Sequence, residues 1–190
     1  MTDTGITFPH GTLSDAAQLA ADAPPRSFAS FAVRPLTPPP GQDILPIVYF
    51  AVRCASCDND AFHIGSYPMA AAGPSVGSDV PPEEAPPCPP HRLRCAGCGG
   101  VGSIFDPATD GYDGILCGGR SYQKGEREVF TGGAFNLHVT AVYNIGLPEM
   151  QDLAARAGGG VKPSDLFDWF NIFGTPVGDD EFFQADYECA

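Results

Sequence analysis

The sequence predicts an α+β fold in which an antiparallel β-sheet carries two cysteine-containing turns and two C-terminal helices cover one of its faces. Residues 134–143 alternate apolar and polar side chains, as a half-buried strand does. Residues 148–157 and 164–173 begin at a proline or a capping serine and end at glycine, which are the usual boundary signals of helices. Two Cys-x-x-Cys pairs, at 54–57 and 95–98, each follow a strand-like segment.

Composition and charge restrict the class of protein and its partners. The chain has 190 residues, of which 43% are hydrophobic, so one domain with a core is expected, while 20 prolines and 23 glycines predict long loops. The formal net charge of −13 opposes contact with a phosphate backbone, so we expect no nucleic-acid partner. An acidic surface suits a basic protein partner, although it also serves solubility.

The sequence also predicts a location for the protein. It contains no run of about 18 apolar residues, which a membrane span needs, and its N-terminus lacks the charged and apolar pattern of a signal peptide. We therefore expect no membrane partner and a cytoplasmic protein whose thiols stay reduced. Seven cysteines, an odd number, also fit a disulfide framework poorly.

Residues 1–43 are predicted to be a loosely attached, proline-rich arm that precedes a single main domain, 44–190. Within the arm, 12–22 has a helical spacing of leucine and alanine, which Pro24 and Pro25 would end. The further prolines that follow favour an extended chain.

The main domain is expected to contain several strands and one insertion. The stretch 68–90 has eight prolines and no aromatic residue, so it cannot bury enough apolar surface to offset the entropy of ordering it. It is interpreted as a flexible surface insertion. Strand-like composition or alternation predicts the sheet at 44–53, 61–67, 91–95, 102–106 and 134–143.

The most specific signal in the chain is a repeated Cys-x-x-Cys pattern, formed by Cys54, Cys57, Cys95 and Cys98. Two such turns can place four thiolates around one ion, and zinc takes tetrahedral sulfur ligands at about 2.3 Å. The 37 residues between the pairs exceed the usual spacing of roughly 15 to 20, but removing the 23 residues of the insertion leaves 14. Gly99 and Gly100 allow backbone N–H groups to turn towards the sulfurs.

These residues, CASC at 54–57 and CAGCGG at 95–100, resemble the knuckle pair of a zinc ribbon or of a rubredoxin. The resemblance covers residues 50–105. It implies a structural metal ion and a small pair of β-hairpins, but no particular function, because such ribbons occur in transcription factors, enzymes and adaptors. The long insertion and the lack of a basic face depart from the ribbons that bind nucleic acid.

Other assignments of the cysteines are open at this point. The four thiols could be free, could form a thioredoxin-like redox pair, or could bind iron, which accepts the same tetrahedral ligands. Four cysteines fill a zinc shell, so a structural site is favoured over a catalytic one. Cys117 is expected either in the core or in place of one ligand, whereas Cys88 and Cys189 are expected to be exposed. For His63 and His91, partial burial or exposure is preferred over ligation.

A carboxylate-rich turn gives an alternative, catalytic hypothesis. The segment FDPATDGYDG contains Asp106, Asp110 and Asp113 among turn-forming residues. His138 lies on the polar face of the last predicted strand. If these four side chains met in a cleft, the protein could be a hydrolase. Ordinary turns and an exposed strand face explain the same residues without chemistry.

The favoured interpretation is a non-catalytic protein with a structural zinc ion that acts by binding another protein, for example as an immunity or antitoxin-like protein against a basic toxin. The chain from Pro163 onwards has seven acidic residues and no lysine or arginine, together with Trp169, Phe182, Phe183 and Tyr187. Such a mixture suits a basic, partly apolar partner. The competing interpretation of this region is a packed helix followed by a solvated tail.

Overall fold

A computed structural model gives the fold of the chain and describes residues 19, 23–36, 47–68, 87–119, 127–178 and 183–188. The described residues form one nine-stranded sheet with two α-helices and two short 3₁₀-helices. In chain order these elements are η1 (Arg26–Phe28), β1 (Phe31–Leu36), β2 (Ile47–Cys54), β3 (Ala61–Pro68), β4 (Pro87–Cys95), β5 (Val101–Phe105), α2 (Gly111–Leu116), β6 (Val129–Phe130), β7 (Phe135–Val142), α3 (Leu147–Ala157), η2 (Pro163–Asp165), β8 (Trp169–Pro176) and β9 (Phe183–Glu188).

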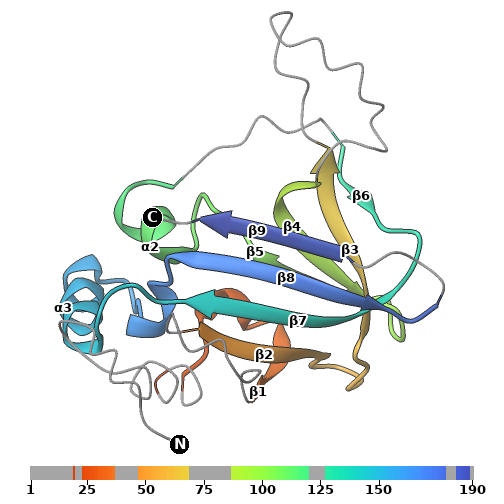
Figure 1. Cartoon of the computed structure of the whole chain (residues 1–190), viewed down its shortest axis with the longest axis horizontal. Helices are drawn as coiled ribbons and strands as arrows, with labels where there is room; N and C mark the ends of the chain where they lie inside the picture. The colour runs from red at the N-terminus through yellow and green to blue at the C-terminus, as the bar shows by residue number, and fades with distance from the viewer. Residues whose placement is uncertain are drawn as a thin grey trace, which may run out of the picture.

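Strand β7 is the centre of the sheet (Figure 1). Along one edge it pairs with the whole of β8, which in turn pairs with β9. Its other edge is shared, because β2 pairs with residues 138–142 and the start of β3 pairs with residues 135–136. All of these pairings are antiparallel. The chain therefore follows one edge of β7, leaves it at the end of β2 and returns to it at the start of β3.

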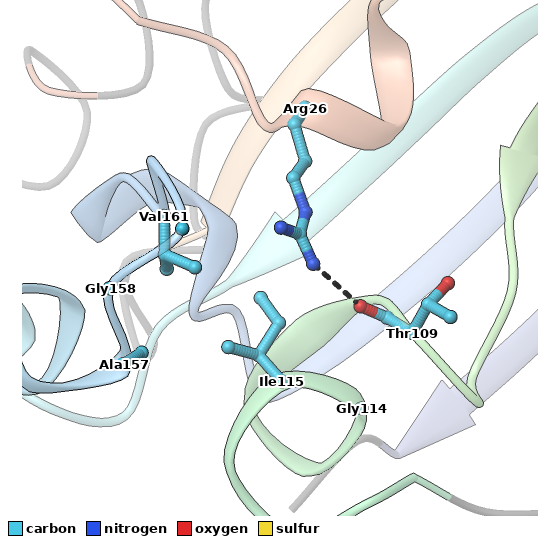
Figure 2. A pocket seen from close by; sticks show the side chains of 8 residues that line it. Arg26, Thr109, Gly114, Ile115, Ala157, Gly158 and Val161 are labelled. Atoms are coloured by element: carbon cyan, nitrogen blue, oxygen red, sulfur yellow. Dashed lines mark hydrogen bonds between the residues drawn. The ribbon is translucent and has the colours of Figure 1, made fainter.

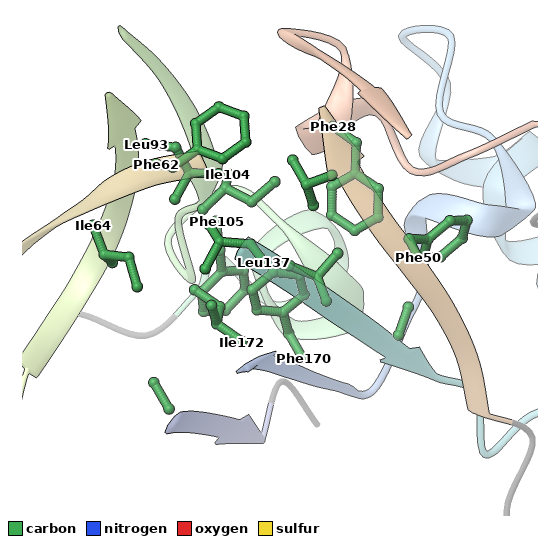
Figure 3. Packing of buried hydrophobic residues seen from close by; sticks show 14 of the residues in the cluster. Phe28, Phe50, Phe62, Ile64, Leu93, Ile104, Phe105, Leu137, Phe170 and Ile172 are labelled. Atoms are coloured by element: carbon green, nitrogen blue, oxygen red, sulfur yellow. The ribbon is translucent and has the colours of Figure 1, made fainter. Parts of the chain in front are cut away.

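The sheet has two parts, one containing β1, β2, β7, β8 and β9 and the other containing β3, β4 and β5. The core lies between these two parts (Figure 3). In the first half of β7 the predicted alternation is confirmed, since Leu137 and Val139 are buried whereas Asn136 and His138 are exposed, but in the second half Thr140 is buried as well. Strands on both sides of the core contribute large apolar side chains, and removing these from water is the main favourable term in folding. Those that are fully buried include Phe50, Phe62, Leu93, Ile104, Phe105 and Phe170.

The sheet curls so that β5, at one end of the strand order, returns towards β1, at the other end. Strand β5 lies against η1 and the turn before β1, and Gly102 permits this approach because a Cβ atom there would lie 2.6 Å from the Cβ of Ser30. Phe31 of β1 and Phe62 of β3 pack edge to face, with ring centroids 5.8 Å apart. Phe28 of η1 is buried in the same interior. The result is a curled half-barrel (Figure 1).

The prediction of two C-terminal helices, and with it the α+β class, is wrong. Helix α3 matches the first of them, but 164–173 forms part of η2 and the first half of β8. A short apolar run rich in aromatic residues fits either period, and pairing with β7 along eight residues decides in favour of a strand. The protein is mostly antiparallel β-structure. None of the described helices has both the length and the apolar character needed to cross a membrane.

Part of the predicted arm contributes to the sheet. Of residues 1–43, the structure describes Leu19 and 23–36, and the latter range contains η1 and β1. Strand β1 pairs with β2 along six residues. The predicted helix at 12–22 lies outside the described residues, apart from Leu19.

The ends of the predicted insertion, 68–90, are also built into strands. Strand β3 ends at Pro68 and β4 begins at Pro87, and these two residues face each other in the β3–β4 ladder. Cys88, expected to be exposed, is therefore buried. Residues 69–86 lie outside the described residues.

Candidate metal centre

The first cysteine pair sits in a tight turn between β2 and β3. The N–H of Cys54 donates to the carbonyl of Asn59 (2.8 Å), and the N–H of Asp58 donates to the carbonyl of Cys54 (2.9 Å). Asp58 adopts a positive φ of 56°, a conformation that aspartate tolerates better than most residues. The side-chain oxygen of Asn59 then accepts the N–H of Ala61 (2.7 Å), which directs the chain into β3.

The second pair sits in a turn of the same construction between β4 and β5. The N–H of Cys95 donates to the carbonyl of Gly100, and the N–H of Gly99 donates to the carbonyl of Cys95, both at 2.9 Å. Gly99 has a positive φ of 74° and occupies the position equivalent to Asp58 in the first turn. The repeated Cys-x-x-Cys pattern thus produces two matching turns, as the sequence predicted.

The two turns bring the four sulfur atoms together. The Sγ atoms of Cys54 and Cys98 are 3.6 Å apart, those of Cys57 and Cys95 are 3.5 Å apart, and all four lie within 4.8 Å of one another. Four sulfurs about 2.3 Å from a central ion would be about 3.8 Å apart, so this spacing could hold a metal ion. It is too long for a disulfide, whose S–S distance is about 2.05 Å. Zinc and iron both accept such an arrangement.

The turns are tied to each other and to the sheet. The N–H of Ala96 donates to the carbonyl of Ala61 across the two turns (2.9 Å). A Cβ atom at Gly97 would lie 3.0 Å from the side chain of Asn59, so glycine lets the turns approach closely. Within each pair, the first cysteine is buried and the second is exposed. The cluster therefore has one side against the core and one side against solvent.

The crowded thiols perturb one another. The backbone N–H of Ser56 has the largest effect on Cys54, and together with the N–H of Cys57 and the neighbouring thiols it lowers the pKa of Cys54 to about 6 against the opposing effect of burial. The N–H of Asn59 also lowers the pKa of Cys57, but the Cys95 thiol, burial and the other neighbouring thiols together raise it to about 12. Adjacent thiolates repel each other, so full ionisation of the cluster requires a compensating cation. A divalent metal ion supplies that charge.

The other cysteines lie outside the cluster. Cys117, expected in the core or as a replacement ligand, is exposed just beyond α2. Cys88 is buried in β4, and Cys189 lies outside the described residues. Among the described residues, Cys54, Cys57, Cys95 and Cys98 form the single group of three or more possible metal-ligating side chains with this proximity.

The two histidines near the turns have other contacts. The Nδ1–H of His63 donates to the carbonyl of Thr131 (3.0 Å). His91 is fully buried, and its Nε2 contacts the hydroxyl of Tyr187. Neither histidine belongs to the sulfur cluster. The expectation of partial burial or exposure fits His63, which is partly buried, but is wrong for His91.

The residues of the catalytic hypothesis are not gathered into a cluster. The Oδ2 of Asp110 accepts the N–H of Asp106 (2.8 Å), and the Oδ1 of Asp106 accepts the N–H of Ala108 (3.0 Å), so both carboxylates shape the turn. Burial raises the pKa of Asp110 to about 6. Asp113 follows in the first turn of α2, whereas His138 lies on the exposed face of β7.

Comparisons with protein-family models, curated proteins and solved structures gave no match. Spacing alone identified the four cysteines, but it did not identify the contact between Gly97 and Asn59 or the bond between Ala61 and Ala96. Both arise from the meeting of two turns that are distant in sequence, and neither has a local signal.

Proposed function

We propose that the protein is a cytoplasmic, non-catalytic protein in which the four cysteines bind one structural Zn²⁺ ion, and that it acts by binding another protein. The observation that carries the metal site is the proximity of the four Sγ atoms, all within 4.8 Å. Four thiolates complete a tetrahedral shell and leave no open position for water or substrate, which favours a structural role over a catalytic one.

The metal content of the purified protein tests the zinc assignment. We expect one zinc ion per chain by plasma mass spectrometry and a loss of that zinc in Cys57→Ser, because a serine hydroxyl is a poor replacement for a thiolate ligand. Cys117→Ser is the matched control, since Cys117 is also an exposed cysteine but lies outside the cluster. It should keep the zinc content of the wild type.

Two results would overturn the zinc assignment. Iron in place of zinc would keep the four ligands but change the metal. Equal zinc content in Cys57→Ser and the wild type would mean that the zinc does not bind at the cysteine cluster. Substitution with Co²⁺ gives a second readout, because tetrahedral thiolate coordination produces strong visible absorption, expected in the wild type and in Cys117→Ser only.

Surface charge and one exposed aromatic residue support the partner proposal. The chain carries a net charge of −13, and the region from Pro163 onwards is entirely acidic in its charged residues. Within this region Trp169 is 41% exposed, whereas Tyr187 is buried and Phe183 is partly buried. An acidic protein that exposes a tryptophan suits a basic partner with some apolar surface.

Affinity capture from extracts of the producing cells tests this proposal. We expect a basic protein that is released when salt is raised to about 0.5 M, since screening weakens contacts between exposed charges. Trp169→Ser should reduce the amount captured, whereas Val177→Ser, which changes another exposed apolar residue, should not. An acidic or salt-insensitive partner, or equal effects of the two substitutions, would contradict the proposal.

A further inference from the structure

A second candidate site lies away from the cysteines, in a pocket of about 300 Å³ that we call the Arg26 pocket (Figure 2). Three segments distant in sequence line it: η1, the region from Thr109 into α2, and the end of α3 with the residues that follow it. Figure 2 shows Arg26 pointing towards Thr109, with Ile115 and Val161 beside its guanidinium. The volume lies at the lower end of the range for ligand sites, about 300 to 1,000 Å³.

Arg26 is held in place at both ends. Its backbone N–H donates to the Oδ1 of Asp165 (2.6 Å), and this buried carboxylate also accepts the N–H of Lys162 (2.8 Å). Its Nη2 donates to the carbonyl of Thr109 (3.0 Å). That bond uses one of the five guanidinium N–H donors and neutralises no charge. In the described part of the chain, Arg26 forms no ion pair.

The rest of the pocket supplies apolar walls and an open rim. Ile115 and Val161 are both partly buried and line it on two sides. Gly158 and Gly159 form part of the rim, and a Cβ atom at either position would meet nothing within 4 Å. A positioned cation beside aliphatic side chains fits an anion that carries a short hydrocarbon group.

Neighbouring charges limit this anion to one negative charge. Asp110 directly follows Thr109, whose carbonyl accepts the Nη2–H of Arg26 (3.0 Å), and burial raises the pKa of Asp110, which the guanidinium acts to lower. Helix α3 ends at Ala157 beside the pocket, and the C-terminal end of a helix carries partial negative charge. In these surroundings a single guanidinium favours a monoanion over a dianion such as phosphate.

We propose that the Arg26 pocket binds a small aliphatic monocarboxylate. The guanidinium of Arg26 holds the carboxylate through paired N–H···O bonds, for which its planar fork is suited. The side chains of Ile115 and Val161 cover the hydrocarbon part. This site goes beyond the proposed function and is independent of the metal, because none of its residues belongs to the cysteine cluster.

Titration of the full-length protein with 4-methylpentanoate, followed by amide NMR shifts, tests the proposal. The amides of residues 109, 114–115 and 157–161 should shift, with a dissociation constant of about 1 mM for a ligand of this size. The uncharged 4-methylpentanamide and inorganic phosphate should each bind at least about tenfold more weakly. Amide binding as strong as that of the acid, or preferential binding of phosphate, would overturn the carboxylate assignment.

Substitutions locate the site. Arg26→Gln should weaken 4-methylpentanoate binding at least about tenfold, whereas Arg34→Gln, which removes another exposed arginine, should leave it unchanged. Because Arg26→Gln also removes the bond to Thr109, Ala157 gives a second pair of variants at the exposed rim. Ala157→Lys should tighten binding and Ala157→Glu should weaken it. Equal effects of Arg26→Gln and Arg34→Gln, or no response to either charge at residue 157, would reject the pocket.

Discussion

His91 couples the stability of the fold to pH. Its imidazole is fully buried, with Nδ1 3.4 Å from the carbonyl of Gly65 and Nε2 in contact with the hydroxyl of Tyr187. A carbonyl only accepts, so Nδ1 carries the proton and Nε2 accepts from the tyrosine hydroxyl. Burial lowers the pKa of His91 to about 4, and the bond to Gly65 opposes this effect only partly. The folded protein therefore keeps His91 neutral at physiological pH.

His91→Gln is expected to remove an acid-sensitive part of the stability. The unfolded chain protonates His91 near pH 6.5 and the folded chain only near pH 4, so between these values the unfolded state binds more protons and stability falls as pH falls. From pH 7.5 to 5, the free energy of unfolding of the wild type should fall by about 2 kcal/mol more than that of His91→Gln. Urea denaturation at the two pH values measures the difference.

For Asp110 the stability changes with pH in the opposite direction from that for His91, so this residue provides the control. Burial is the main cause that raises the pKa of Asp110 to about 6. The contribution of this group to the stability of the fold is therefore fully present below about pH 4 and is lost as pH rises through 6. Asp110→Asn keeps an oxygen that can accept the N–H of Asp106 but removes the titration. Asp110→Asn should therefore lose less stability than the wild type between pH 4 and 6.

For His91, the same pH dependence of stability in His91→Gln and the wild type would contradict the neutral, buried imidazole.

Elements with a local signal could be predicted from the sequence. Helix α3 begins with Pro148 in its first turn and ends before Gly158, and Met150 and Ala154, four residues apart, are its buried positions. Strand β7 could be predicted because a strict two-residue alternation has no helical reading. In α3 the buried positions repeat the pattern of the sequence, and in β7 they do so over residues 135–139, beyond which Thr140 and Val142 are buried as well.

Strands β8 and β9 could not be predicted in this way. The run around Phe167 and Phe170 is apolar enough for one side of a helix. Its conformation is decided by a partner distant in sequence, because the edge of β7 is available for pairing. Strand β9 follows because β8 then offers its own edge, and Ala185 and Tyr187 of β9 face the core. Sheet pairing of this kind is absent from any local window.

The two candidate sites also differ in whether a local signal in the sequence could reveal them. The cysteine cluster was predictable because thiolates at two-residue spacing have a narrow range of chemical uses, and the pattern occurs twice. The Arg26 pocket combines residues from three regions of the chain, and its arginine was assigned to a loosely attached arm. No spacing or composition links Arg26 to Thr109 or Val161, so only the fold reveals the pocket.

At the scale of the whole molecule, the cysteine cluster joins the two parts of the curled sheet. Cys54 ends β2, which belongs with β1, β7, β8 and β9, whereas Cys95 ends β4, which belongs with β3 and β5. The cluster lies where the chain leaves the edge of β7 and returns to it. An ion shared by both turns would therefore cross-link residues 38 to 44 positions apart and restrict the unfolded chain.

Chelation of this ion should loosen one corner of the molecule and leave its centre intact. Among the strands that the structure describes, β5 pairs with β4 alone, so β5 and the turns at 54–59 and 95–100 should exchange amide hydrogens faster without metal. Strands β7 and β8 pair along eight residues and have further strands on both sides, so their exchange should change little. Hydrogen-exchange mass spectrometry of the loaded and chelated protein measures this pattern, and Cys117→Ser should reproduce it. Unchanged exchange in the turns would mean that the ion does not hold them, whereas an equal increase in β7 and β8 would mean that it sustains the whole sheet.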